Sequence, residues 1–299
     1  MYLANLKPRN TVPAAPTAPA LISQGYLRHI VESIAIPRHY LAEPENNARV
    51  RDWIADEFRS LGLEARVVGE TENVAAWYPG SDPAFKILIG AHFDSVPNSP
   101  GADDNASAVA GMIAAAKALK GRADASILFV AFNREEDGLL GSREFAQSLT
   151  PQQIASIECV HILEMIGFAD DRPGTQAMPQ GLPIKLDDTG DFLGVIANRH
   201  SNRHIATISA AAKEKTPGLP VKALKVFLGA EKLFPHLLRS DHSPFWALKV
   251  PALMWTDTSE FRNPHYHRHS DVPETLDYAF MAQTCELLVE TVLRQVRAK

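Results

Sequence analysis

The chain has 299 residues, of which 45% are hydrophobic and 22% charged, and its formal net charge is −5. This is the composition of an ordinary globular protein. A slightly acidic chain lacks the basic surface that phosphates require, so nucleic acid is not an expected partner. Two cysteines, Cys159 and Cys285, are too few for a disulfide framework. No run of about 18 apolar residues occurs, so we expect no membrane-spanning helix.

The first 20 residues differ in composition from the rest. They contain four prolines together with Lys7 and Arg9, where a secretory signal would have a basic segment, an apolar stretch and a cleavage site. We expect residues 1–20 to form an extended arm, and we expect the protein to be cytoplasmic. Residues 21–299 are expected to form a single domain.

Patterns typical of helices and strands alternate along this domain. Apolar residues spaced by three or four predict helices over residues 22–36 and 45–63, the second ending near Gly62. Further along we expect strands over 65–68, 73–78, 85–91, 126–132 and 158–166, with helices over 105–119 and 141–149. This alternation predicts an α/β three-layer sandwich, in which helices flank a mixed, mostly parallel sheet.

The C-terminal part of the chain has a weaker pattern at first. Residues 169–202 are rich in Gly, Pro and Asp and are expected to form an insertion or a loop beside the site. A helix, a strand over 252–255 and a C-terminal helix over 276–297 complete the prediction. Since ligands bind at the carboxyl ends of strands in open α/β sheets, polar side chains just after apolar strands are the candidate site.

The first two candidate groups contain a histidine and three aspartates. His92 and Asp94 follow the strand 85–91, and alternation places them on the same side. A metal-binding histidine commonly donates its other ring N–H to a carboxylate. Asp103 and Asp104 precede the helix 105–119, where a helix cap would account for one acid but not for two.

Three further groups add acids and histidines. Glu135 and Glu136 belong to a run of three acids after the strand 126–132, and such a run is repulsive unless it is solvated or binds a cation. Glu164 lies inside an apolar strand and needs a metal ion or an arginine as partner. The loop 263–271 carries three histidines, including His267. Each group alone has a simpler explanation, as a surface turn, a cap or a solvated loop.

The whole set favours a metal centre. Imidazole and carboxylate ligands without cysteine suit zinc, and also cobalt or manganese. Two divalent ions about 3.5–4 Å apart need a bridging carboxylate, terminal ligands and a further carboxylate as base. The chain supplies every member of that inventory at successive strand ends.

The order of these motifs resembles the dizinc aminopeptidase family. The motifs are H-x-D at His92, P-G-A-D-D-N-A-S from Pro100, E-E at Glu135, an acid within a strand at Glu164, and Y-H-x-x-S-D from Tyr266. The resemblance covers about residues 45 to 295. The family includes bacterial leucyl-type and Streptomyces-type aminopeptidases, with glutamate carboxypeptidase and glutaminyl cyclase as more distant relatives. It implies a zinc-peptidase fold, a peptide substrate and two divalent metal ions, with zinc favoured.

The resemblance also implies metal ligands. His92 would bind one zinc together with Glu164, at a position where many members carry Asp. Glu136 and His267 would bind the other zinc. Asp104 would bridge both ions.

Two further residues would support catalysis. Asp94 would orient His92 from behind, and Glu135 would act as general base on the attacking water. Ser240 and Asp241 resemble a family segment that lines the pocket. The implied activity is removal of N-terminal residues from peptides, and the domain 21–299 would be a metallopeptidase catalytic domain.

Alternative functions stay open from the sequence. The same fold serves other amide hydrolases, carboxypeptidases and glutaminyl-cyclase-like enzymes, and a non-catalytic binding homologue would share it too. The related aminoacylases and desuccinylases insert a separate domain after the E-E pair, whereas here about 28 residues separate Glu136 from Glu164. The sequence does not determine the oligomeric state or the preferred side chain.

Overall fold

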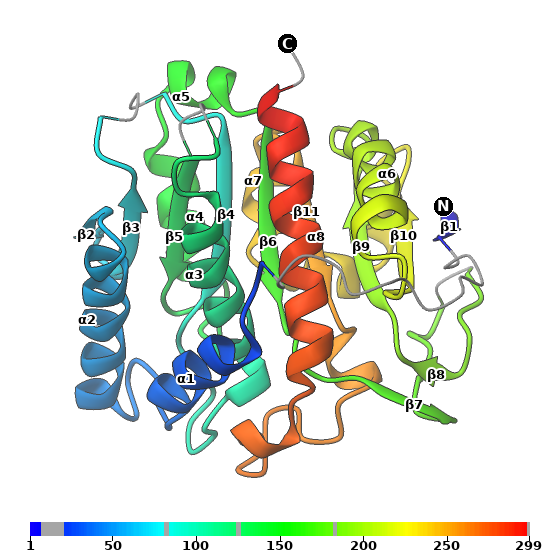
Figure 1. Ribbon diagram of the computed structural model, residues 1–299, viewed down its shortest axis with the longest axis horizontal. Coiled ribbons are helices and arrows are strands. Elements are labelled where there is room, and N and C mark those ends of the chain that lie inside the picture. Colours follow the sequence, from blue (N-terminus) through cyan, green and yellow to red (C-terminus); the bar gives the residue numbers. More distant parts are fainter. Residues whose placement is uncertain (7–20, 81–83, 124–126, 182–183, 298–299) are drawn as a thin grey trace.

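A nine-stranded β-sheet forms the middle layer of the computed structural model, which describes residues 1–6, 21–80, 84–123, 127–181 and 184–297 (Figure 1). The strands lie in the order β1-β10-β9-β11-β6-β4-β5-β3-β2. Their bounds are Tyr2–Leu6 (β1), Glu64–Val68 (β2), Asn73–Trp77 (β3), Ile87–His92 (β4), Ile127–Phe132 (β5), Cys159–Glu164 (β6), Leu193–Ala197 (β9), Val221–Lys225 (β10) and Ala252–Thr256 (β11). The central strands β11, β6, β4 and β5 are parallel, and antiparallel pairs join them to β9 and β3.

One face of the sheet packs against the larger hydrophobic core and its helices. These helices are α1 (Gln24–Ile34), α2 (Pro44–Ser60), α3 (Ala108–Leu119), α6 (Ile205–Lys215) and α8 (Tyr278–Arg297). Every residue of α3 except Lys117 and Ala118 is buried, since small alanine side chains let this helix approach the central strands closely. The helix α2 ends where Gly62 adopts a positive φ of 83°.

The other face carries a second apolar cluster with shorter helices. These are α4 (Leu140–Ser148), α5 (Pro151–Ser156) and α7 (His242–Ala247). Phe132 of β5 and Phe245 of α7 pack in this cluster, with ring centroids 6.4 Å apart. Helices thus cover both faces of a mixed sheet, which confirms the predicted three-layer α/β fold.

The structure corrects the prediction for residues 169–202. The strands β7 (Asp170–Pro173) and β8 (Thr189–Gly190) form a separate two-stranded ribbon, but β9 is an interior strand of the main sheet between β10 and β11. Its five residues include Gly194 and come shortly after Gly190 and Asp191, so the local pattern is weak. The strand β10 is likewise absent from the prediction, because Lys222 and Lys225 interrupt its apolar residues.

The expected N-terminal arm is only partly described. Residues 2–6 form β1, which pairs antiparallel with β10 at the edge of the sheet. Residues 7–20 lie outside the described residues, as does Ser126 at the predicted start of β5. None of the helices in the described ranges is both long and apolar enough to cross a membrane.

Candidate metal centre

The predicted site residues meet at the carboxyl ends of the central parallel strands. His92 is the last residue of β4, and Glu164 is the last residue of β6. Glu135 and Glu136 follow β5, and Asp104 lies in the turn Ala102–Ser107 that leads into α3. Because parallel strands end at the same edge, residues distant in sequence come together there.

Asp104 lies between the two histidines of the cluster. His92 Nε2 is 3.3 Å from Asp104 Oδ1 and 3.5 Å from Glu164 Oε1. His267 Nε2 is 3.2 Å from Asp104 Oδ2 and 3.4 Å from Glu136 Oε2. Each carboxylate oxygen of Asp104 therefore faces a different imidazole.

The donor atoms fall into two groups that could each hold a metal ion. The first group contains His92, Glu135 and Glu164, and the second contains Asp104, Glu136 and His267. Within each group the donor atoms lie within 4.8 Å of one another. The structure thus brings together six of the seven residues with a predicted metal or catalytic role.

The charges of this cluster strongly influence one another. Burial alone would lower the pKa of His92, but the carboxylates of Glu164 and Glu135 raise it well above its ordinary value. Burial, opposed by His92 and reinforced by neighbouring acids such as Glu164, raises the pKa of Glu135. Burial also opposes ionisation of Asp104, but the imidazoles of His267 and His92, each close to one of its oxygens, hold its pKa below the usual range. Several acids thus surround one buried imidazole, an arrangement that a bound cation would stabilise.

The residues fit a metal ion on a second ground. Both ring nitrogens of His92 and the Oε1 atom of Glu136 are buried without a hydrogen-bond partner in the described part of the chain. Buried polar atoms in proteins nearly always have a partner. Imidazole nitrogen and carboxylate oxygen are donors that zinc accepts.

Asp94 lies beside the ring nitrogen of His92 that faces away from Asp104, and it also contacts a second loop. Asp94 Oδ1 is 3.4 Å from His92 Nδ1. Its two oxygens also accept hydrogen bonds from the backbone N–H groups of Glu135 and Glu136, both at 3.1 Å. One carboxylate therefore fixes the β4 histidine and the β5 loop together.

Asp271 and Ser240 hold two other acids of the cluster, Asp104 and Glu164, in position. Asp271 accepts hydrogen bonds from the backbone N–H groups of Asp103 at 2.9 Å and Asp104 at 3.1 Å. The hydroxyl of Ser240 donates to Glu164 Oε2 at 2.6 Å, which leaves Oε1 to face His92. Sequence reasoning gave Ser240 only a general place in the pocket and gave Asp271 no role.

Arg38 is the residue that sequence reasoning missed altogether. Its guanidinium is fully buried and donates to the backbone carbonyls of Phe93, Pro100 and Gly101, in the two loops that carry Asp94 and Asp104. Burial lowers the pKa of Arg38 to about 10, although Asp94 and other nearby acids oppose this shift. An arginine in a loop after Pro37 has no local pattern that distinguishes it from a surface residue.

Other residues singled out from the sequence lie outside the cluster. Asp103 turns away from Asp104 and accepts from the backbone N–H of Gly167 at 2.9 Å. Asp137 pairs with Arg134 at 3.1 Å. Asp241 is fully buried, and burial raises its pKa to about 7.

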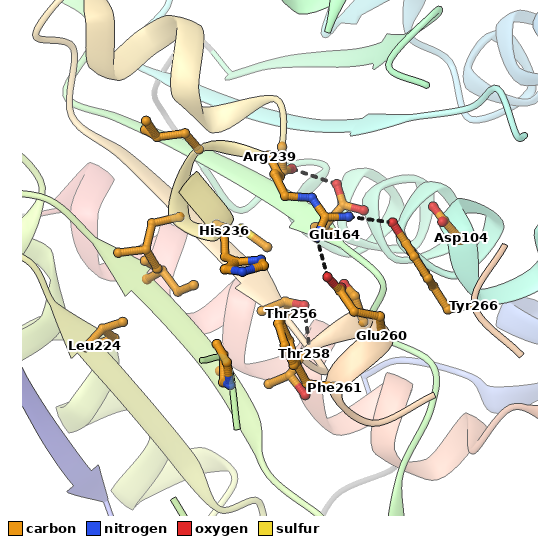
Figure 2. Close-up of a pocket in the computed structure, with 18 of the residues that line it drawn as sticks. Asp104, Glu164, Leu224, His236, Arg239, Thr256, Thr258, Glu260, Phe261 and Tyr266 are labelled. Atoms are coloured by element: carbon orange, nitrogen blue, oxygen red, sulfur yellow. Dashed lines mark hydrogen bonds and ion pairs between the residues drawn. The ribbon is translucent and has the colours of Figure 1, made fainter. Parts of the chain in front are cut away.

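The cluster opens into a cavity of about 400 Å³. Figure 2 shows Asp104, Glu164 and Tyr266 at one end of this cavity and Leu224 at the other. The Tyr266 ring stacks on the His267 ring, with centroids 3.7 Å apart. Arg239 donates to the Tyr266 hydroxyl at 2.9 Å and also pairs with Glu260 (Figure 2).

Comparison with models of known protein families shows to which family the chain belongs. The model described as Peptidase family M28 matches residues 73–292, which include every residue of the cluster. The chain belongs to peptidase family M28. This membership confirms the resemblance and makes the chain a zinc metallopeptidase, as the sequence predicted.

A relative and a solved structure are similar to most of the chain. The chain is 31% identical over 297 residues to the uncharacterized protein YfbL of Escherichia coli (strain K12), a match that covers 92% of this chain and 89% of YfbL. BSAP, a zinc aminopeptidase from Bacillus subtilis, is 26% identical with a TM-score of 0.57, over 75% of this chain and 50% of BSAP.

Two more distant structures share the fold. The LapA aminopeptidase of Legionella pneumophila gives a TM-score of 0.72 at 19% identity, over 93% of this chain and 73% of LapA. A glutaminyl cyclase of Porphyromonas gingivalis gives a TM-score of 0.65 at 18% identity, over 92% of this chain and 99% of the cyclase. The same fold therefore occurs in a protein named as an aminopeptidase and in one named as a glutaminyl cyclase.

Proposed function

We propose that this M28 peptidase is an aminopeptidase that holds two zinc ions and removes N-terminal residues from peptides. The observation that carries the proposal is the position of Asp104, whose two oxygens face His92 and His267 separately at 3.3 and 3.2 Å. A carboxylate between two imidazoles is the arrangement that a shared ligand of two metal ions requires.

The remaining ligands divide between two positions. His92 and Glu164 would hold one ion with Asp104, and Glu136 and His267 would hold the other ion with Asp104. Glu164 is one methylene longer than aspartate, and the Ser240 hydrogen bond fixes its second oxygen, so Oε1 is the oxygen available to the metal. When bound, zinc lowers the pKa of a coordinated water toward about 7 and polarises the substrate carbonyl.

Glu135 would act as the general base. Its backbone N–H is held by Asp94 and its side chain borders the cavity, so the carboxylate is available to substrate. It would accept a proton from the attacking water and return that proton to the leaving amine. Tyr266 borders the same cavity, and because its oxygen accepts from Arg239, its O–H can donate to a substrate carbonyl oxygen.

The acidic lining of the cavity favours an amino-terminal substrate. The carboxylates of Asp104, Glu135, Glu136 and Glu164 border the cavity, and a protonated α-amine of a substrate would be attracted to them. A carboxypeptidase would instead need a cation for the substrate carboxylate. The cavity cations Arg239 and Lys222 already pair with Glu260 and Asp187.

Replacing the base tests this proposal. We expect Glu135→Gln to retain two zinc ions per chain by elemental analysis, while kcat on leucyl-p-nitroanilide falls by roughly 100- to 10,000-fold. Glu32→Gln, on the exposed side of α1, is the matched control and should leave both values unchanged. Wild-type turnover in Glu135→Gln would contradict the assignment of the base.

The same variant distinguishes a base from a ligand. Glu135 belongs to the donor group of His92 and Glu164, so a zinc content near one per chain in Glu135→Gln would make it a ligand instead. A panel of free and N-blocked peptides then tests specificity. Hydrolysis of N-blocked peptides alone would exclude the aminopeptidase activity.

A further inference from the structure

The cavity continues well beyond the metal centre as a region that we call the apolar arm. It is bordered by Leu3, Ile184, Ile196, Leu224, Leu237 and Met254. Figure 2 shows Leu224 on the far side of His236 from Glu164 and Asp104. None of the catalytic steps described above uses this region.

Strand register places the floor of the arm directly beside a metal ligand. Across β6, β11, β9 and β10 the paired residues form a first row of Glu164, Thr256, Gly194 and Lys222. Two residues away in each of these strands, a second row contains Ile162, Met254, Ile196 and Leu224, and Leu3 of β1 pairs with Leu224. Residues two apart in a strand lie on the same face, so both rows belong to one surface.

The length of this floor follows from strand spacing. Neighbouring strands lie about 4.8 Å apart, so the three steps from Glu164 to Lys222 span roughly 14 Å. An extended chain advances about 3.6 Å per three bonds, so this distance corresponds to about 12 bonds. A single small side chain would occupy only the part nearest the metal centre.

The far end of the arm does not select for charge. The ammonium of Lys222 lies 2.5 Å from Asp187 Oδ2 and 4.8 Å from the centroid of the Phe192 ring. Lys222 is therefore already paired, and the next pair on the same face of β10 and β9 consists of the apolar residues Leu224 and Ile196. The arm offers its occupant mainly apolar contact.

Gly194 keeps the passage from the metal centre to the arm open. A Cβ atom at this position would lie 3.2 Å from the carbonyl oxygen of Thr256 and 3.4 Å from Thr256 Cγ2. It would therefore project onto the cavity side of the sheet, in the middle of the first row. A larger side chain at this position would divide the floor in two.

We propose that the apolar arm binds an extended apolar group on the acyl side of the scissile bond, and that Gly194 determines how far this group can reach. The inference rests on the proposed hydrolytic function, because the group must be attached to the carbonyl held at the metal centre. Two kinds of substrate supply this chemistry. One is a peptide with a long apolar N-terminal side chain, and the other is an amide of a fatty acid.

Two series of p-nitroanilides distinguish these sources. The first carries free amines, as alanyl, leucyl and 2-aminodecanoyl derivatives, and the second lacks the amine, as acetyl, hexanoyl and decanoyl derivatives. We expect kcat/KM of the zinc-loaded protein to rise about fourfold per added methylene in the series that matches the natural substrate. No dependence on chain length in either series would overturn the proposal.

The variant Gly194→Val tests the passage itself. We expect the ratio of kcat/KM for the 10-carbon substrate to that for the shortest one to fall at least tenfold, with zinc content unchanged. Gly218→Val adds the same atoms in a turn before β10, where a Cβ would meet only Gln283 Oε1 at an ordinary 3.5 Å, and should leave the ratio unchanged. An equal loss on short and long substrates in Gly194→Val would overturn the role of Gly194.

A binding measurement separates this inference from the proposed function. Calorimetric titration with 2-aminodecanoic acid and with decanoic acid measures binding to the arm without any hydrolysis. If these ligands bind but no anilide is hydrolysed, the proposed function fails and the inference about the arm stands. We expect at least one of these ligands to bind at least tenfold more tightly than alanine or acetate does. If Gly194→Val does not fold, Leu224→Ala replaces it as the test, because it only shortens a side chain. We expect Leu224→Ala to weaken the binding of the long ligand several-fold. Equal affinities for long and short ligands would contradict the proposal.

Discussion

Two histidines are buried in neighbouring strands of the sheet, yet their surroundings are opposite. His161, in the middle of β6, has Nε2 2.8 Å from Gln295 Oε1, and its Nδ1 accepts a hydrogen bond from Trp255 at 3.2 Å. Burial lowers the pKa of His161 to about 3, so the ring is neutral. His92, at the end of β4, faces Asp94, Asp104 and Glu164 at 3.3 to 3.5 Å and has no hydrogen-bond partner among the described residues.

The difference shows that burial by itself does not identify a site. Both rings are essentially inaccessible to solvent. His161 has a neutral hydrogen-bond partner at each ring nitrogen, so it needs no further ligand in the core. His92 has carboxylates on both sides of its ring, and their negative charges need a cation to balance them. A metal ion bound between the ring and these carboxylates would supply that charge.

The largest effect should come from removing the ligand shared by the two metal positions. Asp104→Asn removes the negative charge that faces both His92 and His267, so we expect zinc content below two per chain and a fall in kcat/KM of roughly a thousandfold or more. Elemental analysis and anilide hydrolysis measure these values. Asp137→Asn, an acid in the loop after β5 that pairs with Arg134, is the control. Full zinc content in Asp104→Asn would show that Asp104 is not a bridge.

A smaller effect should follow from the residue behind His92. Asp94→Asn keeps the shape but loses the charge opposite His92 Nδ1, and one oxygen cannot accept both backbone N–H groups as the carboxylate does. Changes of this kind typically cost about 10- to 100-fold in metal affinity or activity. Competition for zinc with a chelator gives the affinity. Unchanged affinity would mean that the ring of His92 is held by other contacts.

The smallest effect should come from the other histidine and should appear only as a pH dependence of stability. The folded pKa of His161 is about 3, below the unfolded value of about 6.5, so the unfolded chain binds more protons between these limits. The free energy of unfolding should therefore fall as the pH drops below 6.5, by up to about 1.4 kcal/mol per pH unit from this residue.

His161→Gln removes this titration and isolates its contribution. We expect urea unfolding at pH 7, 6 and 5 to show that the free energy of unfolding of the variant, relative to that of the wild type, rises by about 2 kcal/mol between pH 7 and pH 5. Zinc content and activity at pH 7 should not change, because His161 lies outside the metal cluster. A parallel pH dependence in the two proteins would mean that His161 is not buried as a neutral ring.

The sequence was informative where short motifs follow apolar strands. From local patterns, His92 and Glu135 could be assigned to positions just after strands and Glu164 to a position within a strand, and the structure brings the three into one group. Arg38 and Asp271 could not be found in this way, because their partners are backbone groups in loops far along the chain. The strands β9 and β10 were missed because Gly194 interrupts the apolar residues of β9, and Lys222 and Lys225 interrupt those of β10.

By itself, then, the sequence determined the layered α/β fold and the residue types at the strand ends, since both depend on patterns within a few residues. Only the tertiary structure decided which oxygen of Asp104 faces which histidine, how Arg38 ties two loops together, and that Gly194 lies in one row with Glu164. These features depend on register between strands that are not consecutive, and on burial that no local pattern specifies. Short sequence motifs therefore predict which residue types form the metal centre, whereas the shape of the substrate cavity depends on how the strands of the sheet are paired.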